Sequence, residues 1–119
     1  MKVAVTSVGT DLDSMIDERF GRSSYFIIAD TDSDEFEVFE NEGLSSAHGT
    51  GVQVAQFIAE KGVQAIITGK IGPNAIKVLK ESGIDVFIAN SMTVRQALAN
   101  FLEGKLEKIS GATTGQHNK

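Results

Sequence analysis

The chain has no cysteine, no tryptophan and a single proline. Without cysteine it can form no disulfide, use no thiolate nucleophile and hold no zinc ion or iron–sulfur cluster through its own thiolates. A chain of 119 residues is nevertheless long enough to bury a core without such crosslinks. Its 41% hydrophobic and 23% charged residues are ordinary values for a globular protein. The composition therefore predicts one globular domain.

Positive charge is also scarce, because 11 Lys and Arg oppose 16 Asp and Glu and leave a net charge of -5. Such a chain repels a phosphate backbone, so we expect no nucleic-acid partner. No apolar run approaches the roughly 18 residues of a membrane span, and no signal-peptide pattern follows the N-terminus. We therefore expect a cytoplasmic protein that does not insert into a membrane.

Hydrophobic patterning predicts five strands and three helices. Valine-rich or continuously apolar runs indicate strands over 2–6, 25–29, 35–40, 65–68 and 85–89. Helical spacing, followed in each case by a glycine, indicates helices over 52–61, 75–81 and 94–102. Thr93 is the expected N-cap of the last helix and Gly104 its expected stop.

The order of these elements predicts an α/β fold. Only a short polar turn separates the second and third strands, which favours an antiparallel hairpin. The later alternation of strands and helices requires parallel strands joined by right-handed crossovers. We therefore expect a mixed five-stranded sheet covered by helices, a single domain over residues 1–109, and a flexible polar tail over 110–119.

Three loops are candidates for a ligand site, because ligands of open α/β sheets bind beyond the carboxyl ends of the strands. The first contains Arg19, Gly21 and Arg22, and its two arginines are the only cations between Lys2 and Lys61. Two arginines in an acidic chain suit an anionic ligand, which they hold with several fixed donors. The plainer alternative is that they pair with nearby carboxylates such as Asp17.

The other two loops are rich in glycine at the start of a helix, where backbone N–H groups and the helix dipole favour anions. The second loop contains His48, Gly49 and Gly51, without the spacing of a nucleotide-binding motif. The third contains Gly72 and Asn74 around the proline. A loop histidine and an ordinary helix start are the plainer interpretations of these two loops.

Acidic residues in the first loop allow a different interpretation. Asp11, Asp13 and Asp17 could hold magnesium, although their spacing fits no calcium loop and a solvated acidic loop is the simpler alternative. No arrangement of a catalytic triad is indicated, because the chain has two histidines and no nucleophile-elbow motif.

Several segments together resemble the dinitrogenase iron–molybdenum cofactor biosynthesis family, whose members include nitrogenase accessory factor-like domains. The resemblance covers residues 1 to about 109 and is carried by MKVAVTS, ERFGRSSYFIIAD, AHGTGVQVAQFIAEKGVQAIITGKIGPNA and TVRQALANFLEGKL. It implies a three-layer α/β/α fold of ribonuclease H-like topology, with the second strand antiparallel. It also implies a non-catalytic carrier of an anionic iron–sulfur or iron–molybdenum-type cofactor or its precursor, with donor and acceptor proteins as partners.

The chain departs from the family pattern at one position of this motif. Members that handle the nitrogenase cofactor often have histidine before the Phe-Gly pair, and here the residue is Arg19. We therefore expect a cargo held by charge and by backbone N–H groups rather than by direct ligation at this position. The predicted binding residues are Arg19, Gly21, Arg22, His48, Gly49, Gly51, Gly72 and Asn74.

Two other functions remain open at the level of sequence. One is a magnesium-dependent enzyme acting on a small phosphorylated metabolite, with His48 as acid or base. The other is a regulatory or interaction domain without a small ligand, because Phe36, Val38 and Phe39 lie on a half-exposed edge strand that could pair with another chain.

Overall fold

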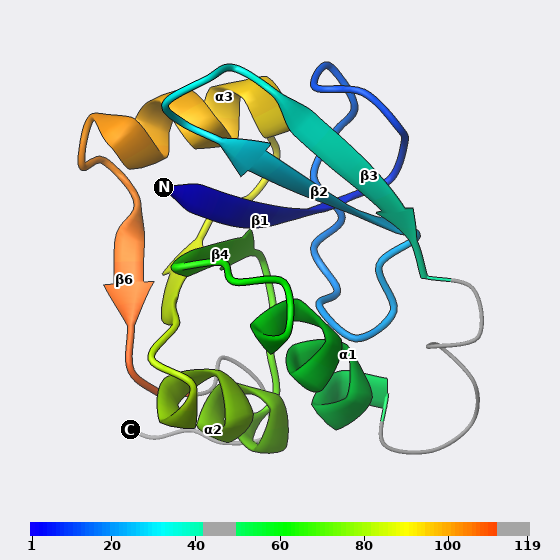
Figure 1. The fold of residues 1–119 in the computed structure, drawn as a ribbon, viewed down its shortest axis with the longest axis vertical. Coiled ribbons are helices and arrows are strands. Elements are labelled where there is room, and N and C mark those ends of the chain that lie inside the picture. Colours follow the sequence, from blue (N-terminus) through cyan, green and yellow to red (C-terminus); the bar gives the residue numbers. More distant parts are fainter. Residues whose placement is uncertain (42–49, 112–119) are drawn as a thin grey trace.

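A computed structural model describes residues 1–41 and 50–111 of the chain. Within them the order of elements is β1 (Lys2–Ser7), β2 (Tyr25–Asp30), β3 (Phe36–Glu40), α1 (Thr50–Ala59), β4 (Ala65–Thr68), α2 (Pro73–Glu81), β5 (Asp85–Ile88), α3 (Val94–Leu102) and β6 (Glu107–Ile109). The strands form one sheet of six strands in the order β3-β2-β1-β4-β5-β6 (Figure 1).

The sheet is mixed, as the sequence predicts. β2 pairs antiparallel with both β1 and β3, which confirms the hairpin, and the parallel pairs β1–β4 and β4–β5 confirm the crossovers. The prediction of five strands is one too few. The sheet also contains β6, which pairs antiparallel with β5 at the edge. β6 is only Glu-Lys-Ile, with a single apolar side chain, so its pattern carries no strand signal.

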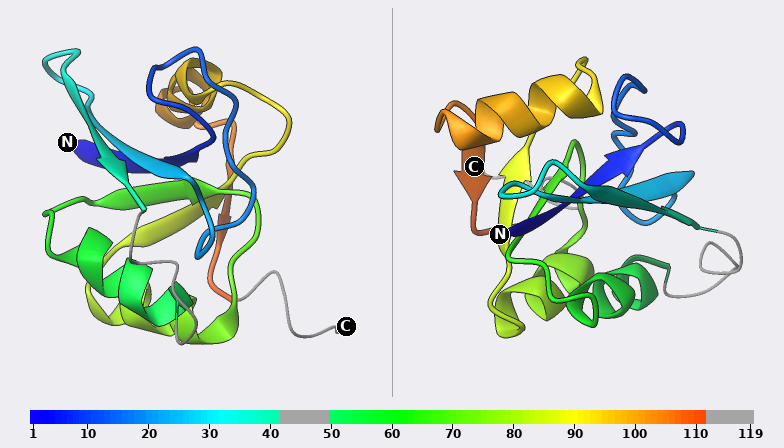
Figure 2. Two further views of the ribbon diagram at one scale, coloured as in Figure 1. Left: turned by 90° about the vertical axis from the view of Figure 1, so that its right-hand side faces the viewer. Right: turned by 45° about the horizontal axis from the view of Figure 1, so that its top comes forward.

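Helices cover both faces of the sheet and complete the three-layer α/β/α fold (Figure 2). On one face α1 and α2 pack through Val54, Ile58 and Leu79 against a core that includes Ala4. On the other face α3 packs through Val94 and Ala97 against a core that includes Val3, Val5 and Ile67. Neighbouring residues of β1 thus face opposite layers, as the two-residue period of a strand requires.

The helix ends follow the sequence signals closely. Thr93 caps α3 with a capping box, in which its hydroxyl accepts from the Gln96 backbone N–H and the Gln96 side chain accepts from the Thr93 backbone N–H. Gly104 follows α3 with a φ of 73°, a conformation that glycine adopts without strain. α1 and α2 each begin two residues before the predicted start, at Thr50 and Pro73. Within the described ranges no helix is both long and apolar enough to cross a bilayer.

Candidate functional site

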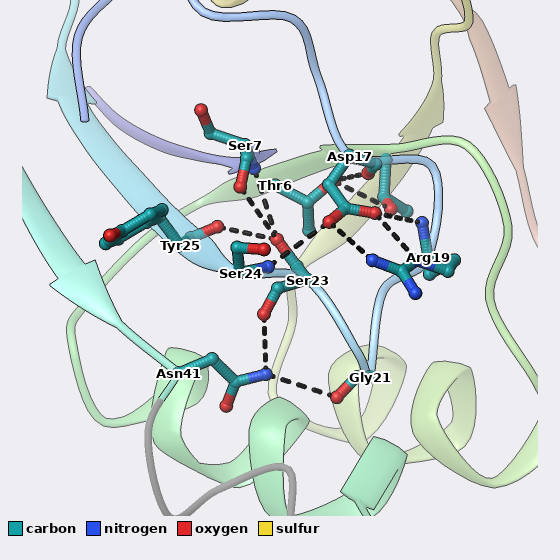
Figure 3. Close-up of polar contacts among 10 residues, drawn as sticks. Thr6, Ser7, Asp17, Arg19, Gly21, Ser23, Ser24, Tyr25 and Asn41 are labelled. Atoms are coloured by element: carbon teal, nitrogen blue, oxygen red, sulfur yellow. Dashed lines mark hydrogen bonds and ion pairs between the residues drawn. The ribbon is translucent and has the colours of Figure 1, made fainter. Parts of the chain in front are cut away.

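The long loop after β1 folds back over the carboxyl ends of β1 and β4 (Figure 3). The Asp17 backbone N–H donates to the carbonyl of Thr6, at 3.0 Å. Further along, the Lys70 N–H donates to the Glu18 carbonyl at 2.6 Å, and the Phe20 N–H donates to the Lys70 carbonyl at 3.1 Å. Residues 18–20 therefore run beside the segment that follows β4, and side chains from both segments meet at one edge of the sheet.

Gly69 makes this approach of the two segments possible. A Cβ at position 69 would lie 2.7 Å from the Glu18 Cβ and 2.9 Å from the Glu18 Cα. Real Cβ atoms do not approach other atoms so closely, so any side chain would push the loop away from the strand. The glycine after β4 is therefore needed for packing, whatever ligand the site takes.

The loop is held by the buried carboxylate of Asp17, which is only 3% exposed. Its Oδ1 accepts from the backbone N–H and from Nε of Arg19, both at 3.1 Å, and its Oδ2 accepts from Arg19 Nη2 at 3.1 Å. Oδ2 also accepts from the Ser24 N–H at 3.2 Å, so one carboxylate ties both ends of the segment 17–24 (Figure 3).

The ion pair fixes the orientation of the Arg19 guanidinium while leaving the side chain 61% exposed. Its hydrogen bond with Asp17, reinforced by the opposite charge, raises the pKa of Arg19 above its ordinary value. The alternative of carboxylate pairing is thus what the structure shows for Arg19. Arg22 has no ion pair with any residue in the described part of the chain.

The end of this loop is braced from the third strand. The Asn41 side-chain amide, directly after β3, donates to the carbonyls of Gly21 at 3.2 Å and Ser23 at 2.8 Å. The Ser23 hydroxyl in turn donates to the Tyr25 carbonyl at 2.6 Å. These contacts hold the Phe20-Gly21-Arg22 turn in a defined position beside α1 and α2 (Figure 3).

A surface depression of about 360 Å³ lies between this turn and the first turns of α1 and α2. Its lining combines cations, glycines and apolar side chains: Arg19, Arg22, Lys70, Gly21, Gly51, Gly72, Phe20, Ile71 and Ala75. Phe20 and Ile71 are each 2% exposed, so the floor is continuous with the core. The depression therefore offers apolar contact beneath exposed positive charge.

Two of the lining glycines leave the backbone at the starts of α1 and α2 uncovered by side chains. Gly72 is the N-cap of α2 and contributes no capping side chain. Pro73 follows it as the first residue of the helix. Gly51 lies in the first turn of α1, and a Cβ there would lie 3.4 Å from the Ala75 Cβ. A ligand can therefore approach the backbone of both helix starts, where the dipole favours negative charge.

Sequence and structural comparisons place this arrangement among known proteins. The sequence profile described as "Dinitrogenase iron-molybdenum cofactor" matches residues 1–104. The chain belongs to the dinitrogenase iron–molybdenum cofactor family. An uncharacterized protein of Methanocaldococcus jannaschii is 38% identical over 113 residues, covering 92% of this chain and 96% of that protein.

Solved structures agree with this assignment. The apo form of the orange protein from Desulfovibrio gigas superposes with a TM-score of 0.92 at 35% identity, covering 95% of this chain and 96% of that one. A Thermotoga protein described as a candidate NifB protein of the DUF35 family superposes with a TM-score of 0.84 at 43% identity, covering 97% and 98%. The family and the fold implied by the sequence motifs are both confirmed.

In this member of the iron–molybdenum cofactor family, the structure brings most of the predicted site residues together. Arg19, Gly21, Arg22, Gly51 and Gly72 all line the depression. Asn74 is exposed on α2 and is not among the lining residues. His48 and Gly49 lie outside the described residues, so their predicted roles stay predictions.

Sequence reasoning missed Lys70 as a third cation of the site. The signal was present, because Lys70 follows the buried strand 65–68 by two residues and therefore had to lie near its carboxyl end. The prediction treated this loop only as a glycine-rich helix start. A lysine at the carboxyl edge of a central strand is as informative as the glycines that flank it.

The three loop aspartates do not form a joint site. Asp17 holds Arg19, Asp13 pairs with Arg95 at 2.9 Å, and Asp11 accepts from the Asp13 backbone N–H at 2.9 Å. The hydrogen bond and charge of Arg95 hold the pKa of Asp13 below its ordinary value. Residues 1–41 and 50–111 contain no group of three or more His, Asp or Glu side chains that could hold a metal ion.

Proposed function

We propose that the chain binds and delivers an anionic iron–sulfur-based metallocofactor, or a precursor of one, and that it does so without catalysing a reaction. The observation that carries this proposal is the meeting of Arg19, Arg22 and Lys70 in one depression of a chain whose net charge is -5. An acidic protein that gathers cations at one place has a local field suited to an anion.

The charges of the depression have different roles. Arg19 is already neutralised by Asp17, so it offers oriented N–H groups more than net charge. Arg22 and Lys70 are exposed, and neither forms an ion pair with any residue that the structure describes. They supply the net positive charge that an anionic cargo would meet, beside the helix starts at Gly51 and Gly72.

The same composition supports release of the cargo. The chain has no cysteine, so it offers no thiolate bond that would have to break before transfer. Contacts through exposed cations, backbone N–H groups and an apolar floor are individually weak and dissociate quickly. Membership in a family named for the iron–molybdenum cofactor supports this kind of cargo, and a carrier of this kind also needs proteins that supply and accept it.

An anaerobic titration tests the proposal. The purified chain is mixed with isolated iron–molybdenum cofactor or with its iron–sulfur precursor, and gel filtration then shows whether iron and sulfide elute with the protein. We expect co-elution with the natural sequence. The double variant Arg22→Gln/Lys70→Gln should lose it, because the unpaired cations of the depression are gone.

A matched control separates the site from the net charge. The variant Lys77→Gln/Lys80→Gln removes equal charge from α2, at positions outside the depression, and should retain the cargo. Absence of co-elution for the natural sequence would refute the carrier function. Equal loss in both double variants would show that only net charge matters and would refute the assigned site. The same gel filtration is repeated with pyrophosphate in place of the cofactor. Co-elution of pyrophosphate, without co-elution of iron in the first experiment, would point instead to a phosphorylated metabolite as the ligand.

A further inference from the structure

A second concave surface lies beside α3, whereas the depression lies beside α1 and α2 on the other face of the sheet. The register of β1 and β2 pairs Lys2 with Asp30, so the turn between β2 and β3 lies beside the start of β1 (Figure 1). Between this turn and α3 is a groove of about 460 Å³. The groove and the cation-lined depression share no lining residue, so the two surfaces do not overlap.

The floor of this groove is apolar and partly exposed. Leu98 and Leu102 lie one turn apart on α3 and therefore share a face of the helix. Leu12, Ala29 and Phe36 complete the apolar lining. Leu102 is 61% exposed and Phe36 is 39% exposed, so these two side chains remain accessible to another molecule. Exposed apolar side chains gathered beside a concave surface are typical of sites that bind another protein.

The rim of the groove is acidic. Of the three cations near it, the N-terminal ammonium and Arg95 pair with carboxylates, whereas the exposed Lys2, beside Asp30, has no ion pair among the described residues. Asp34 and Glu35 line the groove, and neither has an ion partner in the described part of the chain. The N-terminal ammonium pairs with Asp32 at 2.7 Å, and Arg95 pairs with Asp13 at 2.9 Å. Asp34 and Glu35 outnumber Lys2, the one nearby cation without an ion pair, so the groove keeps a net negative charge around an apolar floor.

We infer that this groove binds a basic amphipathic segment of a partner protein, with apolar anchors flanked by lysine or arginine. Leucine-type anchors would meet Leu98 and Leu102, and the flanking cations would meet Asp34 and Glu35. A second copy of the chain would bring the same acidic rim and be repelled, as would an anionic membrane surface. Because the groove adjoins α3 and the depression adjoins α1 and α2, on different faces of the sheet, the partner and a cargo can be bound together.

Nuclear magnetic resonance of the full chain tests this inference without any cargo. The probe is a synthetic amphipathic peptide of leucine and lysine, and a peptide with glutamate in place of lysine is the comparison. We expect the lysine peptide to shift amide signals of residues 29–36 and 95–102 and to leave those of 19–22 and 69–72 unchanged. Glu35→Lys should weaken binding about fivefold, because a rim attraction becomes a repulsion.

Two further variants test whether the peptide binds in the groove itself. Leu102→Asn removes an exposed anchor contact without opening the core, and it should weaken binding while the remaining spectrum stays that of the folded chain. Glu81→Lys changes the charge equally at the end of α2, away from the groove, and should leave the affinity unchanged. Equal weakening by Glu35→Lys and Glu81→Lys would overturn the inference, as would signal changes spread over the whole surface. Dimerisation of the chain that Leu102→Asn abolishes, or binding to anionic vesicles through these residues, would also overturn it.

Discussion

The buried carboxylate of Asp17 holds the exposed guanidinium of Arg19 through two side-chain hydrogen bonds, Nε–Oδ1 and Nη2–Oδ2, each 3.1 Å long. Oδ2 also accepts from the Ser24 backbone N–H, at 3.2 Å. The carboxylate thus serves two purposes at once. It orients an arginine that lines the depression, and it closes the loop that carries Gly21 and Arg22.

Replacing Asp17 should therefore cost more stability than replacing Arg19. In Asp17→Asn an amide N–H₂ group faces N–H donors that the carboxylate accepted, and leaving buried donors unpaired costs about 1–3 kcal/mol. Arg19→Gln removes the charge partner of the buried carboxylate but leaves its two backbone N–H donors in place, so its cost should be the smaller one. Urea unfolding of both variants measures the difference. Equal destabilisation would contradict the bracing role of Asp17.

Gly69 should tolerate a side chain less well than Gly51 of the depression. In Gly69→Ala the new Cβ would lie 2.7 Å from the Glu18 Cβ and 2.6 Å from the Asn90 Oδ1. Relieving this overlap requires the loop to move, at a cost of about 1–3 kcal/mol. Gly111→Ala is the matched control, because among the described residues no atom beyond its own chain neighbours lies within 4 Å of a Cβ built there, and its φ is not positive. A neutral effect of Gly69→Ala in thermal unfolding would mean that the loop moves without cost.

The sequence predicted the fold almost completely, because its signals are local. Alternating or continuous apolar residues predict a buried strand. Thr93 followed by Gln96 three residues later predicts the start of a helix. β6 escaped prediction because pairing with β5, rather than its own composition, makes Glu107–Ile109 a strand. Tertiary pairing of a short polar edge segment leaves no periodic trace in the sequence.

The candidate site was harder to predict because it depends on contacts between distant segments. The arginines could be named from their scarcity in an acidic chain, but the choice of Asp17 as the partner of Arg19 needed the folded loop. The role of Gly69 is equally non-local, because Glu18 and Asn90, both distant in sequence, occupy the space that a side chain there would need. Lys70 was within reach of sequence reasoning, which considered its glycine neighbours instead.

The pair of Asp13 and Arg95 joins the loop after β1 to α3, and its titration can be followed directly. The hydrogen bond from Arg95 and then its charge hold the pKa of Asp13 below its ordinary value of 3.8. Because the pKa is lowered in the folded state, the pair's contribution to stability is present above that ordinary value and is lost as the pH falls through the folded-state pKa. Carbon-detected NMR titration of the carboxyl group measures this shift. In Arg95→Gln the pKa of Asp13 should return toward 3.8, and an unchanged value would show that another group causes the shift.

Ionic strength should decide how tightly the depression holds an anionic cargo. Arg22 and Lys70 are exposed, so salt screens their charges, and the screening length falls from about 10 Å at 0.1 M to about 3 Å at 1 M. The affinity for isolated iron–molybdenum cofactor, measured anaerobically by absorbance, should therefore fall as sodium chloride is raised. Lys70→Gln should lower the affinity at low salt and flatten its dependence on salt, because one of the two unpaired cations is missing. Lys77→Gln, outside the depression on α2, should leave both the affinity and the slope close to those of the natural sequence. An affinity independent of salt would show instead that apolar contact with Phe20 and Ile71 or direct ligation holds the cargo, and that the cations are incidental to binding.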